Sequence, residues 1–224
     1  MAKLPASLVT QRGTDKQFDE LTETTECVGR LQLYSKGKAI NMGLIRPGHY
    51  GIAESDEEII DLGDVIDILP LARRPKAIDM TDPDAVIESY DPESEEFKRI
   101  TARSFEKASH CMFGPSFLVI ERSTGRFLEF FCGSKGTRSE AKKLYPFCPL
   151  TDADIARQKA AGNDVTSLNA HGPLPLTFKV RLVEKGTYSF HLPVVEKCST
   201  PFTNLPTTGR ITKEVRAFIS YDER

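Results

Sequence analysis

The sequence predicts a β-rich α+β fold, built on a partly open barrel or sandwich with short helices at its ends. Short apolar segments alternate with polar residues, glycine-containing turns separate these segments, and amphipathic helical stretches are few. The 13 Phe and 6 Tyr residues supply enough large side chains for a core, and 224 residues suffice for one domain with loose ends.

Three regions differ in pattern. Residues 1–26 are polar, rich in Thr and Glu and without periodicity, so we expect a flexible N-terminal arm. Residues 27–198 carry the strand signals and form the predicted β-rich core domain. Residues 199–224 form a C-terminal tail, in which the apolar spacing between Ile211 and Ile219 predicts a short helix.

The N-terminal half of the core domain predicts short strands. Leu31–Tyr34 and Ile40–Leu44 alternate apolar and polar residues around the turn Lys36–Lys38, which predicts a hairpin. Tyr50–Ala53 and Val65–Leu71 predict two more strands.

Helices are expected at three further places. Asp91 and Pro92 are typical of an N-cap and first helical position, which predicts an amphipathic, basic helix to about Ala108. Residues 139–145 and 151–161 predict two short helices.

Two later hairpins have registers that the pattern can predict. In Ser116–Cys132 a three-residue loop, Ser123–Gly125, places Ile120 opposite Leu128 and leaves Phe117, Phe127 and Phe131 on the other face. In Leu176–Val195 a two-residue and a three-residue loop are both possible. The three-residue loop Glu184–Gly186 gives the more coherent apolar face, pairs Leu182 with Tyr188 and leaves Lys179, Arg181, Ser189 and His191 on a polar face.

The net charge of -2 conceals a strong asymmetry along the chain. Residues 54–96 hold 15 acidic and 3 basic residues, whereas residues 97–224 hold 12 acidic and 20 basic residues. This asymmetry suggests a polyanionic partner for the basic part. The alternative is that the two parts attract each other within the fold.

Several classes of function lack their signatures. His110 and Cys111 are the only local pair of metal ligands, and adjacent side chains on a strand diverge, so no metal site and no cofactor are expected. No nucleophile elbow appears, so we predict no catalytic residues and no enzyme. The segment Cys132–Thr137 lacks the spacing of a Walker motif and predicts an ordinary strand-to-helix turn. The alternative is that it holds a phosphate through its backbone amides and Lys135.

The five scattered cysteines indicate reduced thiols and a cytoplasmic location. The N-terminus has no apolar signal segment, and the apolar runs are too short for a membrane partner.

Basic and aromatic residues are interleaved between residues 98 and 143, which hold 10 basic and 4 acidic residues. Cations neutralise phosphates and aromatic rings on a sheet stack bases, so this stretch predicts binding of single-stranded nucleic acid. The alternative is that the Phe residues form a second core layer and the cations are merely solvated. The candidate nucleic-acid contacts are Lys98, Arg99, Arg103, Lys107, Phe117, Arg122, Arg126, Phe127, Phe131, Lys135, Arg138, Lys142, Lys143, Lys179 and Arg181.

Four short blocks carry a resemblance to a known group of proteins. Leu69–Ala77, Cys111–Pro115, Phe190–Val195 and Cys198–Phe202 are similar to bacteriophage-encoded proteins, some of which are thought to bind single-stranded DNA. The resemblance spans about residues 60–205 and implies an oligonucleotide/oligosaccharide-binding (OB) type barrel in the host cytoplasm. The chain departs from the usual pattern because it has no Trp and no acidic tail ending in Phe, so cooperative binding and recruitment of repair partners are not implied.

The sequence therefore predicts a non-enzymatic, phage-type protein that binds single-stranded DNA. The alternative is a protein-interaction or structural protein, of a virion or a regulatory assembly, that docks a protein partner or associates with itself.

Overall fold

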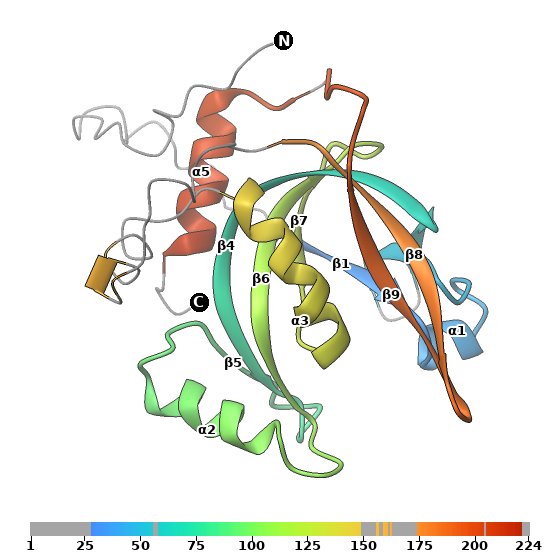
Figure 1. Ribbon diagram of the computed structural model, residues 1–224, viewed down its shortest axis with the longest axis vertical. Helices are drawn as coiled ribbons and strands as arrows, with labels where there is room; N and C mark the ends of the chain where they lie inside the picture. The colour runs from blue at the N-terminus through green and yellow to red at the C-terminus, as the bar shows by residue number, and fades with distance from the viewer. Residues whose placement is uncertain are drawn as a thin grey trace.

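The computed structural model describes residues 28–55, 58–148, 156, 159–160, 162, 174–203 and 205–220. Within them the chain forms one nine-stranded mixed sheet with helices packed against it (Figure 1). The predicted arm at residues 1–26 lies outside the described residues, as does most of the predicted helix at 151–161.

The strands are β1 (Gly29–Tyr34), β2 (His49–Ala53), β3 (Ile59–Gly63), β4 (Val65–Asp79), β5 (Ile87–Ser89), β6 (Cys111–Glu121), β7 (Phe127–Phe131), β8 (Leu176–Lys185) and β9 (Tyr188–Lys197). The helices are α1 (Lys38–Asn41), α2 (Glu95–Arg103), α3 (Lys135–Ala141), the 3-10 helix η3 (Lys142–Phe147) and α5 (Thr208–Ile219).

The sheet is curled but not closed. Its strand order is β3-β2-β1-β7-β6-β4-β8-β9, with β5 paired to β4. β1 and β7 are parallel, and the other pairs are antiparallel. The curl brings β8 and β9 back toward the first strands, since the Tyr50 hydroxyl donates to the Lys179 carbonyl at 3.1 Å and the His191 amide donates to Ser35 Oγ at 2.8 Å. The predicted β-rich α+β class is confirmed.

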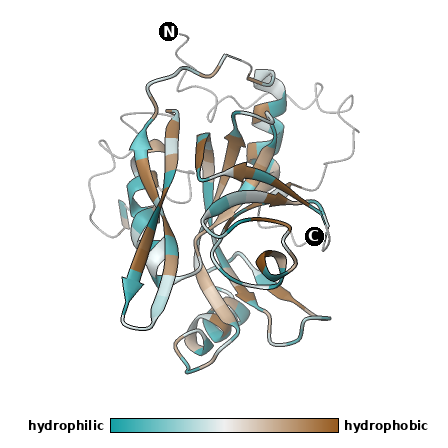
Figure 2. Ribbon diagram, turned by 90° about the vertical axis from the view of Figure 1, so that its right-hand side faces the viewer, coloured by the Kyte–Doolittle hydropathy of each residue, from teal (hydrophilic) through white to brown (hydrophobic). Residues whose placement is uncertain are grey.

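Both faces of the central strands are buried. On one face Phe117, Val119 and Leu128 belong to the main core, which Ala141 and Leu144 of α3 and η3 help to cover. On the other face Leu118, Ile120 and Phe127 pack with Ile211 and Phe218 of α5 and form the outer core. Hydrophobic residues, brown in Figure 2, accordingly dominate these strands. The predicted C-terminal helix is confirmed, and it packs on the same sheet.

The predicted hairpin over residues 31–44 is wrong in its second strand. Residues 38–41 form the single turn α1, in which the Asn41 amide donates to the Gly37 carbonyl, and β1 pairs with β2 instead. Gly37 and Gly43 flank this turn at positive φ, a conformation that favours glycine and interrupts a strand. The strands predicted at residues 50–53 and 65–71 are present, and β4 continues to Asp79.

The β6–β7 register differs from the prediction by one residue. Phe117 pairs with Phe130, and Val119 pairs with Leu128, because the loop has four residues rather than three. The Glu121 carboxylate fixes that loop by accepting the amides of Ser123 and Thr124, each at 2.8 Å. A slip of one residue exchanges the faces, so Phe127 lies on the face opposite Phe117.

The predicted β8–β9 register is also wrong. Lys185 pairs with Tyr188 around a two-residue loop, and Leu182 faces His191. Arg181 faces Leu192, so the predicted polar face does not exist. The prediction assumed that burial of one face selects the register. At this end of the hairpin Leu182 is 52% and Tyr188 70% exposed, so burial does not select the register there.

The helix predicted at residues 91–108 is shorter in the structure. α2 begins after Ser94, whose hydroxyl accepts the Phe97 amide, and ends at Arg103. Instead of the helix predicted at residues 139–145, α3 starts at Lys135 and η3 follows it. Within the described part of the chain, none of the helices has the length and apolar composition needed to cross a bilayer.

Candidate functional site

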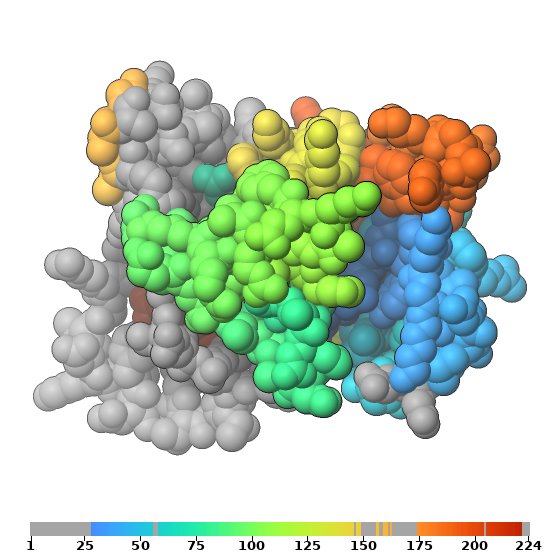
Figure 3. Space-filling view, turned by 90° about the horizontal axis from the view of Figure 1, so that it is seen from below, coloured from blue at the N-terminus to red at the C-terminus, as the bar shows by residue number. Residues whose placement is uncertain are grey.

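A basic cleft of about 560 Å³ lies between α2 and α3, above the middle of β4 and β6. In Figure 3 the green atoms of the α2 region and the yellow atoms of α3 lie side by side on one face. The cleft is lined by Arg73, Arg74, Pro75, Phe97, Phe113, Gly114, Pro115, Lys135, Arg138, Ser139, Lys142 and Tyr145. No acidic side chain belongs to this lining among the residues that the structure describes.

One wall of the cleft is a basic stripe on α3 and the first residue of η3. Lys135, Arg138, Ser139 and Lys142 follow the i, i+3, i+4, i+7 spacing that places side chains on one helical face. Ser134 starts the helix through a capping box with Thr137. The segment Cys132–Thr137 is thus a strand-to-helix turn, as predicted, and its own side chains occupy the first amides.

Two guanidinium groups lie over aromatic rings that line the cleft. Arg73 lies 4.3 Å from the centre of the Tyr145 ring, and Arg138 lies 4.2 Å from the centre of the Phe113 ring. Arg138 also donates to the Phe113 carbonyl at 2.7 Å. A Cβ at Gly114 would lie 3.1 Å from the Arg138 side chain and 2.2 Å from the Cys132 carbonyl oxygen, so glycine makes this approach possible.

Four of the five cations that line the cleft, namely Arg73, Lys135, Arg138 and Lys142, form no ion pair with a carboxylate in the part of the chain that the structure describes. Lys135 and Lys142 are exposed, and neither they nor Arg73 form an ion pair within the described part of the chain. Arg73 Nε is buried and has no hydrogen-bond partner there. The guanidinium of Arg74 turns to the opposite face of the sheet, where it meets Glu129 at 3.2 Å. Arg73, Lys135, Arg138 and Lys142 therefore give the cleft a positive potential that an anion can use.

The structure places most of the other predicted cations in ion pairs with the acidic stretch 54–96. The pairs are Arg126–Glu54, Arg122–Asp67 at 3.1 Å, Arg103–Asp79 at 2.5 Å, Lys98–Glu95 at 3.5 Å and Arg99–Glu96 at 3.5 Å. Arg122 also donates to the carbonyls of Thr200 and Pro201. For these residues the attraction between the acidic and basic parts is internal to the fold, as the alternative interpretation proposed.

The remaining four predicted cations also lie outside the cleft lining. Lys143 pairs with Glu140 at 2.6 Å, and Lys179 pairs with Glu196 at 2.6 Å. Arg181 lies 3.8 Å from Glu140. Lys107 is exposed in the turn that follows α2.

The stacking role predicted for Phe117 and Phe127 is wrong. Phe117 is fully buried in the main core, and Phe127 is 8% exposed in the outer core, so neither ring can accept a base. Phe131 is half-buried, with the Lys76 amine 5.6 Å from its ring centre. The alternative, in which these rings form core layers, is correct for Phe117 and Phe127.

The sequence interpretation missed Arg73 and Tyr145 as site residues. The signal for Arg73 was a run of cations, Arg73, Arg74 and Lys76, inside an otherwise apolar strand. Cations inside a core strand have to be paired or turned toward a polar cavity. No comparable signal existed for Tyr145, because its place in the cleft depends on how η3 packs.

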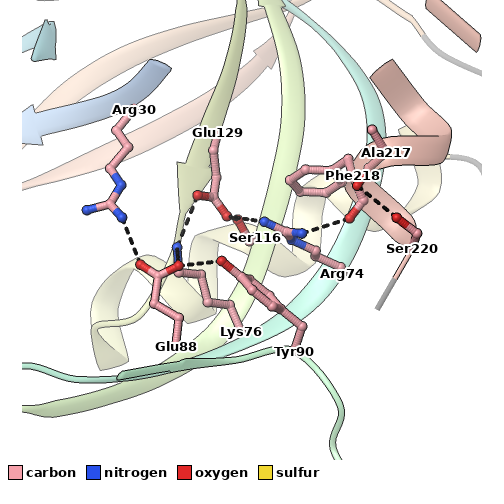
Figure 4. Close-up of polar contacts among 10 residues, drawn as sticks. All are labelled: Arg30, Arg74, Lys76, Glu88, Tyr90, Ser116, Glu129, Ala217, Phe218 and Ser220. Carbon is pink, nitrogen blue, oxygen red and sulfur yellow. Dashed lines mark hydrogen bonds and ion pairs between the residues drawn. The ribbon is translucent and has the colours of Figure 1, made fainter. Parts of the chain in front are cut away.

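A buried charge network lies on the face of the sheet opposite the cleft, since Lys76 and Ser116 point away from Arg73 and Phe117. Figure 4 shows the contacts within this network. The Lys76 amine, 2% exposed, lies 3.0 Å from both Glu88 and Glu129. Ser116 donates to Glu129 at 2.7 Å, and Arg74 donates to the Phe218 carbonyl at 2.9 Å. The network therefore ties α5 and β5 to the central strands.

Opposing effects set the pKa values of the two carboxylates in the network. Burial by itself raises the pKa of Glu129, but attraction by Lys76, the Ser116 hydrogen bond and Arg74 outweigh it and hold the pKa below its ordinary value. The pKa of Glu88 is lowered too, since Tyr90 and Lys76 outweigh its burial. This network is structural, because its charges are already satisfied within the fold.

Asp79 makes the stability of the fold sensitive to acid. Hydrogen bonds from the Thr81 hydroxyl and amide, with help from Arg103, lower its pKa to about 2. A lowered pKa adds stability above the unfolded value of about 4, and this contribution is lost as the pH falls toward 2. We expect urea unfolding to show a shallower fall in free energy between about pH 4 and 2 for Asp79→Asn than for the wild type. Identical pH slopes would contradict the assignment.

Comparisons with known proteins identify no match to this chain. No protein-family model matches the chain, no curated protein matches it, and no solved structure matches it. The described residues contain no group of three or more His, Cys, Asp or Glu side chains placed to hold a metal ion.

Proposed function

We propose that the protein binds single-stranded nucleic acid in the cleft between α2 and α3. The observation that carries the proposal is the set of cleft cations, Arg73, Lys135, Arg138 and Lys142, which line a cleft in which no described residue is acidic. Phosphates are the natural ligands of guanidinium and ammonium groups. The sequence predicted contacts on a face of the sheet. The site that we propose is instead the cleft between α2 and α3.

The aromatic residues favour a nucleic acid over a simple anion. Phe97, Phe113 and Tyr145 line the same cleft as the cations. A volume of about 560 Å³ falls within the range of roughly 300–1,000 Å³ typical of ligand sites, which accommodates a nucleotide. Single strands expose their bases to such rings, whereas a duplex keeps its bases stacked inside. A single strand therefore uses both kinds of side chain.

We also propose the OB-type barrel and the phage-type role that the sequence resemblance implies. A curled, open sheet supports an OB-like arrangement. Two of the blocks behind the resemblance, Leu69–Ala77 and Cys111–Pro115, contain the floor of the cleft. The proposed role is binding alone, without catalysis.

A protein-interaction function remains the second candidate, favoured by a different surface. Tyr188, at the outer end of the β8–β9 hairpin, is 70% exposed and shares a face of the hairpin with the half-buried Val183 and Phe190. Accessible apolar side chains that lie together are typical of contacts with another protein. Binding of a protein at this surface would not involve nucleic acid.

The test is the binding of a fluorescently labelled oligothymidylate, followed by anisotropy as salt is raised. For single strands the logarithm of affinity falls with that of salt by about 0.7 per neutralised phosphate, so three or four contacts predict a slope of about -2 to -3. Absence of binding by folded protein at about 20 mM salt would exclude the nucleic-acid proposal and favour the protein-interaction function.

A further inference from the structure

An exposed aromatic ring stands beside the cleft. Phe105 is 73% exposed, and its ring centre lies 5.5 Å from that of Phe113 at an interplanar angle of 58°. The helix predicted to run to about Ala108 would have included Phe105. Because α2 ends at Arg103, Phe105 lies in the turn that follows it.

Phe113 connects this ring to the cleft. One partner of the Phe113 ring is Phe105, and another is the Arg138 guanidinium, 4.2 Å from the ring centre. Phe113 also lines the cleft. Aromatic surface therefore continues from the basic floor of the cleft to the exposed Phe105 ring.

The turn that carries Phe105 is held by hydrogen bonds. The Ser104 hydroxyl donates to the Thr101 carbonyl at 2.6 Å, and the Glu106 amide donates to the Arg103 carbonyl at 3.0 Å. Ala108 closes the turn at a φ of 61°, which L-residues other than Asn and Asp rarely adopt. A ring on such a turn is positioned before a ligand arrives, which lowers the entropic cost of binding.

We propose that Phe105 is a stacking platform for a base of the bound strand, whose phosphates lie against Lys135, Arg138 and Lys142. This inference rests on the proposed function and names the residue that recognises bases. A simple polyanion would use the cations and leave Phe105 uncovered. A single strand would cover the ring, because every base has a face that stacks on an aromatic side chain.

The absence of tryptophan from the sequence allows a direct optical test. Phe105→Trp introduces a single tryptophan at the proposed platform, and Tyr188→Trp introduces one at a similarly exposed site, the tip of the β8–β9 hairpin. Each variant is titrated with oligothymidylate and with inorganic polyphosphate, which has phosphates and no bases. We expect oligothymidylate to quench Phe105→Trp emission and leave Tyr188→Trp emission unchanged. Polyphosphate should quench neither variant.

Binding affinities supply the second readout. Phe105→Ala should weaken oligothymidylate binding by about 5-fold to 100-fold, leave polyphosphate binding unchanged and preserve the salt slope. Phe105→Tyr keeps the ring and should restore the affinity. Because the side chain is exposed, thermal melting should show both variants folded.

The outcomes separate the two proposals. If oligothymidylate binds the wild type but neither quenches Phe105→Trp nor distinguishes Phe105→Ala, the platform is overturned and the cleft proposal stands. If oligothymidylate binds no more tightly than polyphosphate, the cleft recognises anions alone and the platform is likewise overturned. If neither ligand binds the wild type, both proposals fail.

Discussion

Replacing Glu129 with alanine is expected to lower the free energy of unfolding by about 3–5 kcal/mol, because it leaves buried cations without a principal counterion. Lys76 is 2% exposed, and among the described residues Glu88 is the one acidic partner that it keeps in the variant. Arg74 loses its carboxylate contact, and Ser116 loses its hydrogen-bond acceptor. Glu129, on β7, contacts cations of β4 and a hydroxyl of β6, so the loss of this one side chain is expected to have a large effect.

Urea unfolding at neutral pH measures this effect. Glu95→Ala is the matched control, since it also removes one carboxylate, but from an ion pair at the surface of α2 in which Glu95 is 96% exposed. The control should change the free energy of unfolding by less than about 0.5 kcal/mol. A loss below about 1 kcal/mol in Glu129→Ala would show that the network does not need this carboxylate.

Local sequence pattern predicted most strands but not their registers. Residues 50–53, 116–121, 127–131 and 176–195 were placed correctly as strands, because alternation and turn residues are local signals. The β6–β7 register depended on Glu121 folding back over its loop, a side-chain contact that no hydrophobic pattern reports. The strand predicted at residues 40–44 is absent, because β1 pairs with β2 rather than with these residues.

The residues of the candidate site could also be predicted only in part from the sequence. Composition identified the basic stretch 98–143, which does supply Lys135, Arg138 and Lys142 to the cleft. It could not tell these cations from Arg103, Arg122 and Arg126, whose acidic partners lie 24 to 72 residues away in the sequence. Those pairs form only when the fold brings α2 and the β6–β7 loop close to β4 and to the end of β2. Which cations remain unpaired is therefore a property of the tertiary fold.

Reversing two cleft charges is expected to have the largest effect on function. Lys135→Glu with Lys142→Glu should weaken oligothymidylate binding by about 100-fold or more at low salt, because two attractions to phosphate become repulsions. Both side chains are exposed and without ion-pair partners in the described residues, so the fold should be kept. Thermal melting of the variant checks this.

The matched control reverses two exposed lysines of the β8–β9 hairpin, Lys185→Glu with Lys197→Glu. It changes the net charge by the same amount as the cleft variant. Its affinity for oligothymidylate should stay within about threefold of the wild type, since neither lysine lines the cleft.

The most direct test of the cleft is the salt dependence of oligothymidylate affinity, measured side by side for the wild type and the two double variants. Loss of two phosphate contacts should reduce the steepness of the slope by about 1.4 in the cleft variant and leave it unchanged in the hairpin variant. Equal losses of affinity and slope in both variants would mean that binding follows net charge, and would contradict a site between α2 and α3.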